Sequence, residues 1–507
     1  MTLLLLSLAL AAPADDVHTC LDLYDLDCAR AAATHLGSSA ADLEAKAELE
    51  FHLGHFALAR DGMVTAAKGL AADIEVANQV ELYQKTVAAT ADFESRSRGD
   101  VTVQFRPGMD EVLLDEAFET LQAAHDRIGP VLGGAPPGGV RMELYPTAQR
   151  FIDASSLPGA AVRTTGVIAL SKWTRLLVSS PRALGRGYEW KDTIAHEYIH
   201  YIVAWRTKDR APVWLQEGIA RSHESLWRQD EPAALTPEQE SLLADALADD
   251  KLVPLAKMHP SMAFLSSAEE ASLAFAQVST MIVYLRKSSG PEAVSKVLDL
   301  VRGGRDALQA VADVGAGGDP DAFMEGWKRY LGTLSLVSKK LASKQVVLDG
   351  GGDEFADDPV LGDRADLARA VRLGDILMDH ARADAALVEY QKAALGSDTP
   401  SPLLTARTAE ALLKLGRRDE ARSILNDSVH DYPEDATTRV ALGALLLAEG
   451  NRQGAFAQYR AAIDINPFDA PTQAILGDLY AARGDTAMAE RHHHYARLLQ
   501  SAEPATR

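Results

Sequence analysis

The chain has 507 residues, with 51 basic and 72 acidic side chains and a formal net charge of −21. A chain of this length forms roughly two to four domains, and one so acidic is a poor partner for nucleic acids or anionic membranes. Because no run of about 18 apolar residues follows the N-terminus, we expect no transmembrane segment and no nucleic-acid partner.

An apolar run, Leu3–Ala12, stands near the start and leads into the small-residue sequence Ala12-Pro13-Ala14. Such a run before a small-x-small site is typical of a secretory signal peptide. We therefore predict a signal peptide over residues 1–14 and an exported protein, periplasmic or secreted. No Lys or Arg precedes the run, and the alternative is a buried first helix.

The chain has two cysteines, Cys20 and Cys28. In an exported protein they can form a disulfide. Eight residues of straight helix would separate them by about 12 Å, which is too far for such a bond. A disulfide therefore needs a turn between them, and two free thiols are the alternative.

Residues 15–98 are rich in Ala and Leu at helical spacing, which predicts an N-terminal helical region. Within Ala45–Leu70, the small residues Gly54, Ala59 and Ala66 resemble those of one degenerate tetratricopeptide repeat. A plain helical hairpin is the equal alternative. The polar segment Ser95–Asp100 (SRSRGD) is predicted to be a linker.

Residues 99–340 combine strand and helix patterns, which predicts an α+β domain. Alternating apolar residues predict strands over Val101–Phe105, Val140–Tyr145, Thr164–Leu170 and Thr174–Ser179. Helical spacing predicts helices over Asp110–Ile128 and Thr147–Ala154 and mostly helical structure from Leu235 to Gly332.

The motif that carries chemistry is His196-Glu197-Tyr198-Ile199-His200, an H-E-x-x-H sequence. Nothing from Asp192 to Trp205 breaks a helix, and residues four apart share one helix face, so His196 and His200 can present two imidazole nitrogens to one metal ion. Glu197 projects about 100° round the helix from His196, where it can reach a water on the metal without ligating the metal.

A second segment, Trp214–Ala220, holds one carboxylate, Glu217, among mostly apolar residues. Two His and one Glu form a catalytic zinc set that leaves the fourth position open. The alternative is a surface helix with unrelated His side chains. The apolar neighbours of the motif, such as Ile194 and Ile199, instead indicate a buried helix, in which polar groups need partners.

HEYIH followed by PVWLQEGIA resembles the gluzincin metallopeptidases, specifically the peptidase-MA-like domains that are often fused to tetratricopeptide repeats. The resemblance covers about residues 100–340. It implies a small mixed sheet plus a helical subdomain, Zn²⁺ as cofactor and a peptide or protein substrate. It also implies His196, His200 and Glu217 as metal ligands and Glu197 as general base.

Two positions depart from the pattern of that family. Thermolysin-like relatives carry an acidic residue four positions after the third ligand, where it orients a ligand His. Here that position is Arg221, so either Glu224 takes the role or the ligands are supported differently. A Tyr often stands in peptidase-MA-like domains where Phe275 stands here. A Tyr hydroxyl can stabilise an oxyanion and Phe cannot, so either Tyr198 or Tyr284 serves or catalysis is weak.

In gluzincins an edge strand just before the zinc helix pairs with the backbone of the bound peptide. The segment Thr174–Ser179 stands at that place in this sequence. An ordinary internal strand is the alternative for the same residues.

Residues 341–365 contain Gly350–Gly352 among acidic residues and are predicted to be a linker. Residues 366–503 repeat with a period of about 34, which resembles about four tetratricopeptide repeats in an all-α solenoid. The clearest unit has small, aromatic and proline residues at Gly443, Gly450, Ala455, Tyr459, Ala462 and Pro467. Such an array is either a stabilising cap or a concave surface for a protein partner.

Three adjacent histidines, His492, His493 and His494, lie in the last repeat. They cannot all face one ion from a helix, so we predict a solvated face there and no metal site.

These features together predict a zinc-dependent endopeptidase or peptidase with a repeat domain for partner or substrate binding. The alternative is a catalytically weak or inactive peptidase-like domain that serves as a repeat-based interaction scaffold. Arg221 and Phe275 favour that alternative, and the ligand set with Glu197 favours the enzyme.

Overall fold

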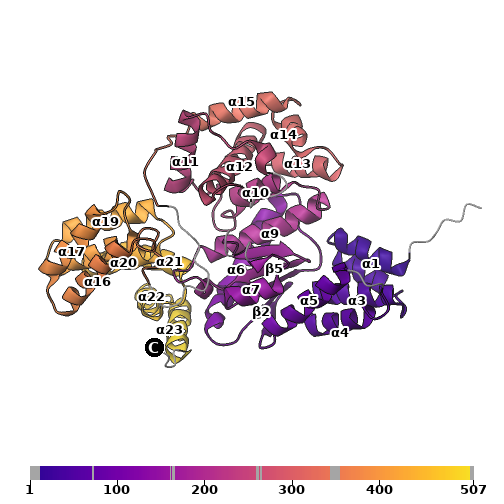
Figure 1. The fold of residues 1–507 in the computed structure, drawn as a ribbon, viewed down its shortest axis with the longest axis horizontal. Coiled ribbons are helices and arrows are strands. Elements are labelled where there is room, and N and C mark those ends of the chain that lie inside the picture. The colour runs from indigo at the N-terminus through magenta and orange to yellow at the C-terminus, as the bar shows by residue number, and fades with distance from the viewer. Residues whose placement is uncertain are drawn as a thin grey trace, which may run out of the picture.

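The computed structural model describes residues 12–70, 74–159, 162, 166–258, 262, 265–342 and 354–502. Most of the predicted signal peptide therefore lies outside the described residues. Four parts follow one another along the chain: a helical N-terminal region, a small sheet with its covering helices, a helical subdomain and a C-terminal helical array (Figure 1). Among the described helices we find none with the length and apolarity of a membrane span.

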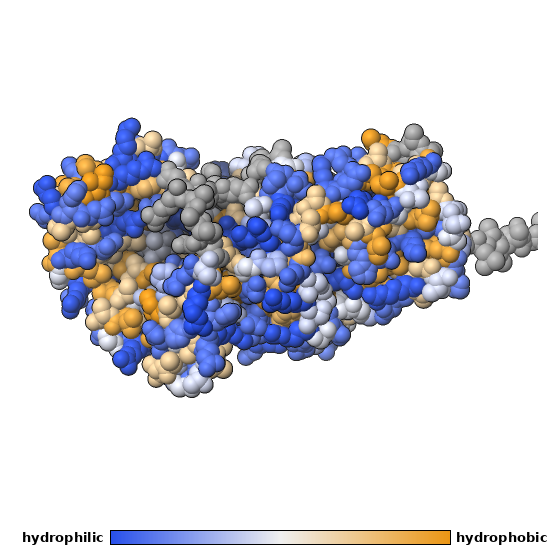
Figure 2. Space-filling view, turned by 90° about the horizontal axis from the view of Figure 1, so that it is seen from below, coloured by the Kyte–Doolittle hydropathy of each residue, from blue (hydrophilic) through white to orange (hydrophobic). Residues whose placement is uncertain are grey.

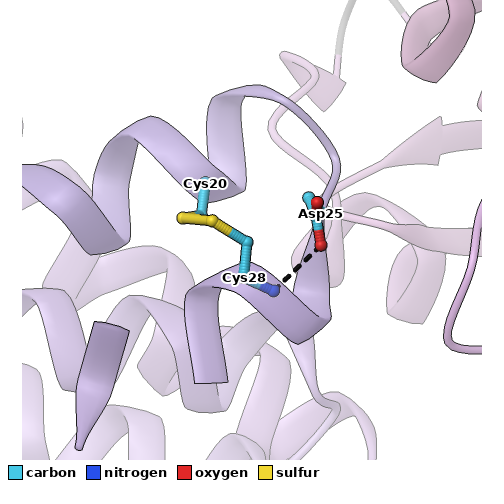
Figure 3. The surroundings of a disulfide bond; sticks show 3 residues. All are labelled: Cys20, Asp25 and Cys28. Carbon is cyan, nitrogen blue, oxygen red and sulfur yellow. Dashed lines mark hydrogen bonds between the residues drawn. A yellow bond between two sulfur atoms is a disulfide. The ribbon is translucent and has the colours of Figure 1, made fainter. Parts of the chain in front are cut away.

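The N-terminal region contains helices α1 (Pro13–Asp22), α2 (Leu26–Ala33), α3 (Ala40–His52), α4 (Phe56–Ala66) and α5 (Ile74–Ala89). Cys20 and Cys28 form a disulfide with their Cα atoms 5.5 Å apart (Figure 3). The turn between α1 and α2 brings them together, and there the Asp25 carboxylate accepts a hydrogen bond from the Cys28 N–H at 2.9 Å. Of the two alternatives for the cysteines, the bridge across a turn is the one observed.

Within the described residues the sheet has five strands: β1 (Glu94–Arg98), β2 (Val101–Phe105), β3 (Val140–Tyr145), β4 (Ala169–Lys172) and β5 (Arg175–Ser179). Their order is β1-β2-β3-β5-β4, with β2, β3 and β5 parallel and the two edge strands antiparallel to their neighbours. The predicted small mixed sheet is therefore present.

Two expectations about the strands are wrong. Residues 95–98 of the predicted linker Ser95–Asp100 lie in edge strand β1, which pairs with β2 through a turn at Gly99. All five β1 residues are exposed, so this strand has no apolar alternation to reveal it. The segment Thr174–Ser179 forms β5, which is an internal strand, and the edge beside it is β4.

The helices α6 (Leu114–Val131) and α9 (Trp190–Thr207) cover one face of the sheet, and α5 and α7 (Ala148–Ala154) cover the other. Strand β5 shows why: Leu176 and Val178 enter the main core with α6 and α9, whereas Leu177 enters the core on the opposite face. The single helix predicted over Asp110–Ile128 is a 3₁₀ turn, η1 (Met109–Leu113), followed by α6. A second 3₁₀ turn, η2 (Pro181–Ala183), follows β5.

The subdomain after α9 is helical, as predicted. It consists of α10 (Val213–His223), α11 (Pro237–Ala248), η3 (Leu255–Met258), α12 (Ala268–Ser289), α13 (Ala293–Arg302), α14 (Ala307–Gly315) and α15 (Pro320–Leu331). Its apolar faces share one continuous core with α6 and α9, so the sheet region and the helical subdomain are packed as one body.

Four helix pairs form the C-terminal array: α16 (Ala365–Asp379) with α17 (Ala383–Leu395), α18 (Pro402–Lys414) with α19 (Arg418–Asp431), α20 (Ala436–Ala448) with α21 (Arg452–Ile465), and α22 (Ala470–Ala482) with α23 (Thr486–Ala502). In the pair α20–α21 a small residue opposite an aromatic ring lets the two helices approach closely: a Cβ added at Gly443 would lie 3.1 Å from the Tyr459 ring. The predicted all-α repeat array is confirmed.

The segment between the subdomain and the array differs from the predicted linker. Gly350–Gly352 lie outside the described residues, but residues 354–364 are packed against the first repeats. Phe355 and Leu361 are buried in the repeat core, and the buried Asp358 accepts a hydrogen bond from the Ser401 hydroxyl at 2.9 Å. These apolar residues, spaced among acidic ones, belong to the array.

The array also contacts the motif helix directly. Lys191, in the first turn of α9, lies 2.5 Å from Asp464 of α21 and 3.1 Å from Glu116 of α6, and Arg460 of α21 lies 2.6 Å from Glu116. Burial raises the pKa of Glu116, but Arg460 and Lys191 outweigh burial and lower that pKa to about 2. Glu116 is therefore ionised at neutral pH, and its ion pairs with Lys191 and Arg460 join the repeats to the start of α9.

We expect a fragment of residues 354–507 to be helical and to melt cooperatively, and one of residues 366–507 to be less stable. The shorter fragment lacks Phe355, Val360 and Leu361, and full burial of one such side chain contributes about 1.5–3 kcal/mol. Circular dichroism melting of the two fragments measures the difference. Equal melting temperatures would show that residues 354–365 are no part of the repeat core.

Candidate metal centre

Helix α9 holds the H-E-x-x-H motif in a buried position. Residues 190–207 contain neither Gly nor Pro, and the helix ends where Lys208 takes a left-handed φ of +54°. Helix α10 packs against it and carries Glu217. Gly218 lets α10 also approach α12, because a Cβ there would lie 2.8 Å from the Val278 carbonyl oxygen. Glu217 is thereby held opposite the two histidines.

Three predicted ligands converge on one point: one donor atom each from His196, His200 and Glu217, all within 4.8 Å of one another. The two Nε2 atoms are 3.0 Å apart, and the Glu217 carboxylate oxygens lie 3.4 Å from His196 Nε2 and 3.6 Å from His200 Nε2. Tetrahedral zinc with bonds of about 2.0–2.2 Å separates its donor atoms by about 3.4 Å. The donor set and its spacing therefore fit a zinc ion.

Glu224 supports this set from the other side of the His196 ring. The Nδ1–H of His196 donates to a Glu224 carboxylate oxygen at 2.7 Å, which leaves Nε2 facing His200 and Glu217. Arg221 stands where the family resemblance led us to expect an acidic residue that orients a ligand His. The geometry favours Glu224 as the residue that takes this role. Such partners fix the ring orientation of a ligand His.

The ionisable groups of this site shift one another's pKa values. Burial and Arg221 lower the pKa of His196, but hydrogen bonds to Glu217 and Glu224 outweigh them and raise it to about 9. Burial lowers the pKa of His200 to about 4. Burial raises the pKa of Glu217, but both histidines outweigh it and lower that pKa to about 2. Without a metal, the His196 imidazolium thus holds the two carboxylates together at neutral pH.

Glu197 lies beside the ligands and forms no ion pair with a Lys or Arg in the described part of the chain. Its side chain is 7% exposed, and burial raises its pKa to about 7. The backbone of Ser171, in edge strand β4, is close enough to the Glu197 carboxylate to act in the opposite direction and lower that pKa. A carboxylate with a pKa near the working pH suits a general base.

We expect zinc binding at pH 8 to release about one proton, because His196 must lose its proton to ligate the metal. The apparent affinity for zinc should fall by about tenfold for each pH unit below about 9 and level off above that pH. Calorimetry in buffers of different ionisation enthalpy measures the protons released. The control is Glu224→Gln, which removes a charge that raises the His196 pKa and should move the plateau to lower pH. Zinc binding without proton release at pH 8 would contradict this assignment.

The two tyrosines considered as oxyanion donors lie away from the centre. Tyr198 is fully buried, and its hydroxyl is 2.9 Å from His125 Nδ1. Tyr284 faces Gly326 and stacks on Tyr330. Phe275 contacts Arg221. Neither tyrosine is directed at the ligands, so the two proposed oxyanion donors are not brought to the site.

The three adjacent histidines are not one solvated face. His492 is fully buried, and its Nδ1 lies 2.7 Å from the Gln473 side-chain oxygen, whereas His493 pairs with Asp478 at 3.0 Å. The solvated-face prediction is therefore wrong for His492. Helix packing inside the last repeat explains its burial.

Sequence reasoning missed two contributors to the site. The Ser171 backbone has no side-chain signature in the sequence. Gln216 acts on His200 by raising its pKa against the effect of burial, and it stands next to Glu217 in the sequence. The only signal for Gln216 in the sequence is its position directly before Glu217, the third predicted ligand.

No protein-family profile and no curated protein sequence matches this chain. Solved structures show partial likeness. A crystal structure of MamA is 18% identical over 28% of this chain and 81% of its own, with a TM-score of 0.24. YrrB, described as a TPR protein with an unusual peptide-binding site, is 21% identical over 28% of this chain and 72% of its own, with a TM-score of 0.23. MamA from Desulfovibrio magneticus RS-1 is 14% identical over 45% of this chain and 98% of its own, with a TM-score of 0.24.

Proposed function

We propose that this chain is a zinc-dependent peptidase that hydrolyses peptide bonds. The observation that carries the proposal is the convergence of His196, His200 and Glu217, with donor atoms 3.0–3.6 Å apart, beside the buried carboxyl group of Glu197. Two imidazoles and one carboxylate are the donors of catalytic zinc sites in which one position stays open.

His196, His200 and Glu217 would hold the ion. When bound, zinc polarises the scissile carbonyl group and lowers the pKa of a water molecule. Glu197 accepts the proton from the attacking water and passes it to the leaving amine. Glu224 keeps the His196 ring in the orientation that ligation requires, through the 2.7 Å hydrogen bond to Nδ1.

Edge strand β4 is the element we propose for substrate binding. It pairs only with β5 in the described sheet, and the backbone of its residue Ser171 reaches Glu197. An extended peptide can add to such an edge through main-chain hydrogen bonds, which hold many sequences equally well. Strand addition thus suits β4 and not Thr174–Ser179.

The test is the digestion of a generic unfolded protein by the purified full-length chain. We expect cleavage that a zinc chelator abolishes and added zinc restores. A chain that holds one equivalent of zinc and cleaves no unfolded protein or peptide would overturn the peptidase proposal.

The second candidate is a repeat-based interaction scaffold in which the peptidase-like domain is weak or inactive. Its support is apolar surface on the first repeat, where Leu373, Ile376 and Val388 are 45%, 53% and 48% exposed. Figure 2 shows apolar patches on the left-hand end of the molecule, where the repeats lie. Such surfaces mark interaction sites, so the array is proposed to bind a protein partner or substrate under either function.

We also propose that the protein is exported. Its support is the disulfide between Cys20 and Cys28, since such bonds persist in oxidising compartments. The mass of the protein recovered outside the cytoplasm tests this. We expect loss of residues 1–14, and a full-length intracellular chain with reduced cysteines would contradict it.

A further inference from the structure

Arg221 brings a cation to the candidate metal centre. It lies four residues after Glu217, on the same face of α10. Its guanidinium group stacks over the Phe275 ring, 5.4 Å from the centroid, and one of its N–H groups donates to Glu224 at 3.3 Å. In the described part of the chain no other Lys or Arg forms an ion pair with Glu197, Glu217 or Glu224.

The exposure of Arg221 sets it apart from its neighbours. Its side chain is 42% exposed, against 8% for His196, 14% for His200 and 20% for Glu217. The guanidinium group is also close enough to act on the pKa values of these three ligands and of Glu197. It therefore stands at the solvent side of the site, where a substrate would arrive.

Among the described residues, most of the hydrogen-bonding capacity of Arg221 is unused. A guanidinium group has five N–H donors and stays charged at any physiological pH, and the bond to Glu224 is the only one that engages it within the described part of the chain. Phe275 has no hydroxyl group, so it cannot donate a hydrogen bond to an oxyanion. Its ring instead packs against the flat face of the Arg221 guanidinium group. The tyrosines Tyr198 and Tyr284 are committed elsewhere.

We propose that Arg221 stabilises the oxyanion formed during peptide hydrolysis, a role that rests on the proposed peptidase function. When water adds to the scissile carbonyl carbon, the C=O electron pair moves onto oxygen, and Arg221 N–H groups donate to it. The pair then re-forms the C=O bond, the C–N bond breaks, and the leaving amine takes the proton that Glu197 removed from water. A donor aimed at developing charge lowers the barrier without changing ground-state binding.

Two other roles for Arg221 predict different changes in zinc binding, KM and kcat. If Arg221 only held Glu224 in place, its loss would disturb the His196 ring and weaken zinc binding. If it bound the terminal carboxylate of a substrate, its loss would raise KM and leave kcat unchanged. The oxyanion role predicts a lower kcat with KM and zinc content unchanged.

The experiment compares Arg221→Ala, Arg221→Lys and the control Arg228→Ala in the full-length zinc-loaded protein. Arg228 has the same 42% exposure and pairs with Asp192 at 2.6 Å. We expect Arg221→Ala to lower kcat by about 10²- to 10³-fold, as loss of one oxyanion donor does. Arg221→Lys should recover part of the loss, free guanidinium ion should partly rescue Arg221→Ala, and Arg228→Ala should match the wild type.

A phosphinic peptide gives a readout independent of turnover, since its tetrahedral phosphorus carries oxygens where the oxyanion forms. We expect Arg221→Ala to bind it about 10²-fold more weakly than the wild type by calorimetry. Equal binding, lost zinc or a pure KM effect would overturn the role of Arg221 while the wild type remains an active peptidase. A wild-type chain that holds no zinc and cleaves no peptide would overturn both proposals.

Discussion

Glu197→Gln is expected to keep one equivalent of zinc and to lose peptide hydrolysis by a factor of about 10² to 10⁴. Glu197 lies beside the three proposed ligands and is none of them, so a bound ion should keep all of its donors. Gln has nearly the same shape, so the fold should survive. Its amide cannot accept a proton at neutral pH, and the attacking water then lacks its base.

The measurement pairs zinc content with the rate of cleavage of a quenched peptide. Glu217→Gln is the matched control, because it makes the same chemical change on a ligand and should lower zinc affinity as well as rate. A Glu197→Gln variant that cleaves peptides at the wild-type rate would remove Glu197 from the mechanism.

Arg175→Ala should destabilise the sheet region by about 3–5 kcal/mol, because it leaves a buried carboxylate without its partner. Arg175 is fully buried, and its guanidinium lies 3.1 Å from Glu143, which is 1% exposed. The guanidinium also stacks on Phe51 and Phe56 of the N-terminal helices at 4.5 and 4.7 Å. Burial raises the pKa of Glu143 even with Arg175 present, so the loss of Arg175 should drive that carboxyl group towards its neutral form.

Hydrogen–deuterium exchange of the β3 and β5 amides measures this loss locally, which suits a chain of several packed parts. The control is Arg305→Ala, which breaks an exposed pair with Asp313 and should leave the protection of β3 and β5 unchanged. Unchanged protection of β3 and β5 in Arg175→Ala would show that the aromatic residues alone hold the N-terminal helices on the sheet.

The sequence predicted those features that rest on local periodicity. The motif helix, strands β2, β3 and β5 and the repeat helices all have regular spacing of apolar or small residues. Strand β1 has none, because its residues are exposed on both faces. It is held by pairing with β2 and by contacts such as the ion pair of Arg98 with Asp115. The sequence also did not show that β4, and not β5, is the edge strand. The order of strands in a sheet depends on which strands pair, and no single segment encodes that.

In the candidate site, too, residues with a local sequence signal could be predicted, and residues that depend on helix packing could not. His196 and His200 could be named because four-residue spacing places two imidazoles on one helix face. Glu217 could be named because it is the one carboxylate of the segment Trp214–Ala220, and the family resemblance implies a Glu ligand there. Glu224 could only be offered as an alternative, since its contact with His196 depends on how α10 crosses α9. The cluster of Lys191, Glu116, Arg460 and Asp464 joins three helices far apart in the chain, so the docking of the repeats on α9 had no local signal.

Zinc content after gel filtration tests the central claim most directly, in the wild type and in variants of the four residues around the metal. We predict about one equivalent in the wild type and none retained by the His196→Ala, His200→Ala double variant or by Glu217→Ala. Glu224→Ala should still bind zinc, with an affinity about 10- to 100-fold lower, because it loses only the partner of His196. Full zinc retention in the double variant would contradict the account, and zinc lost by Glu224→Ala but kept by Glu217→Ala would show that the third ligand is Glu224.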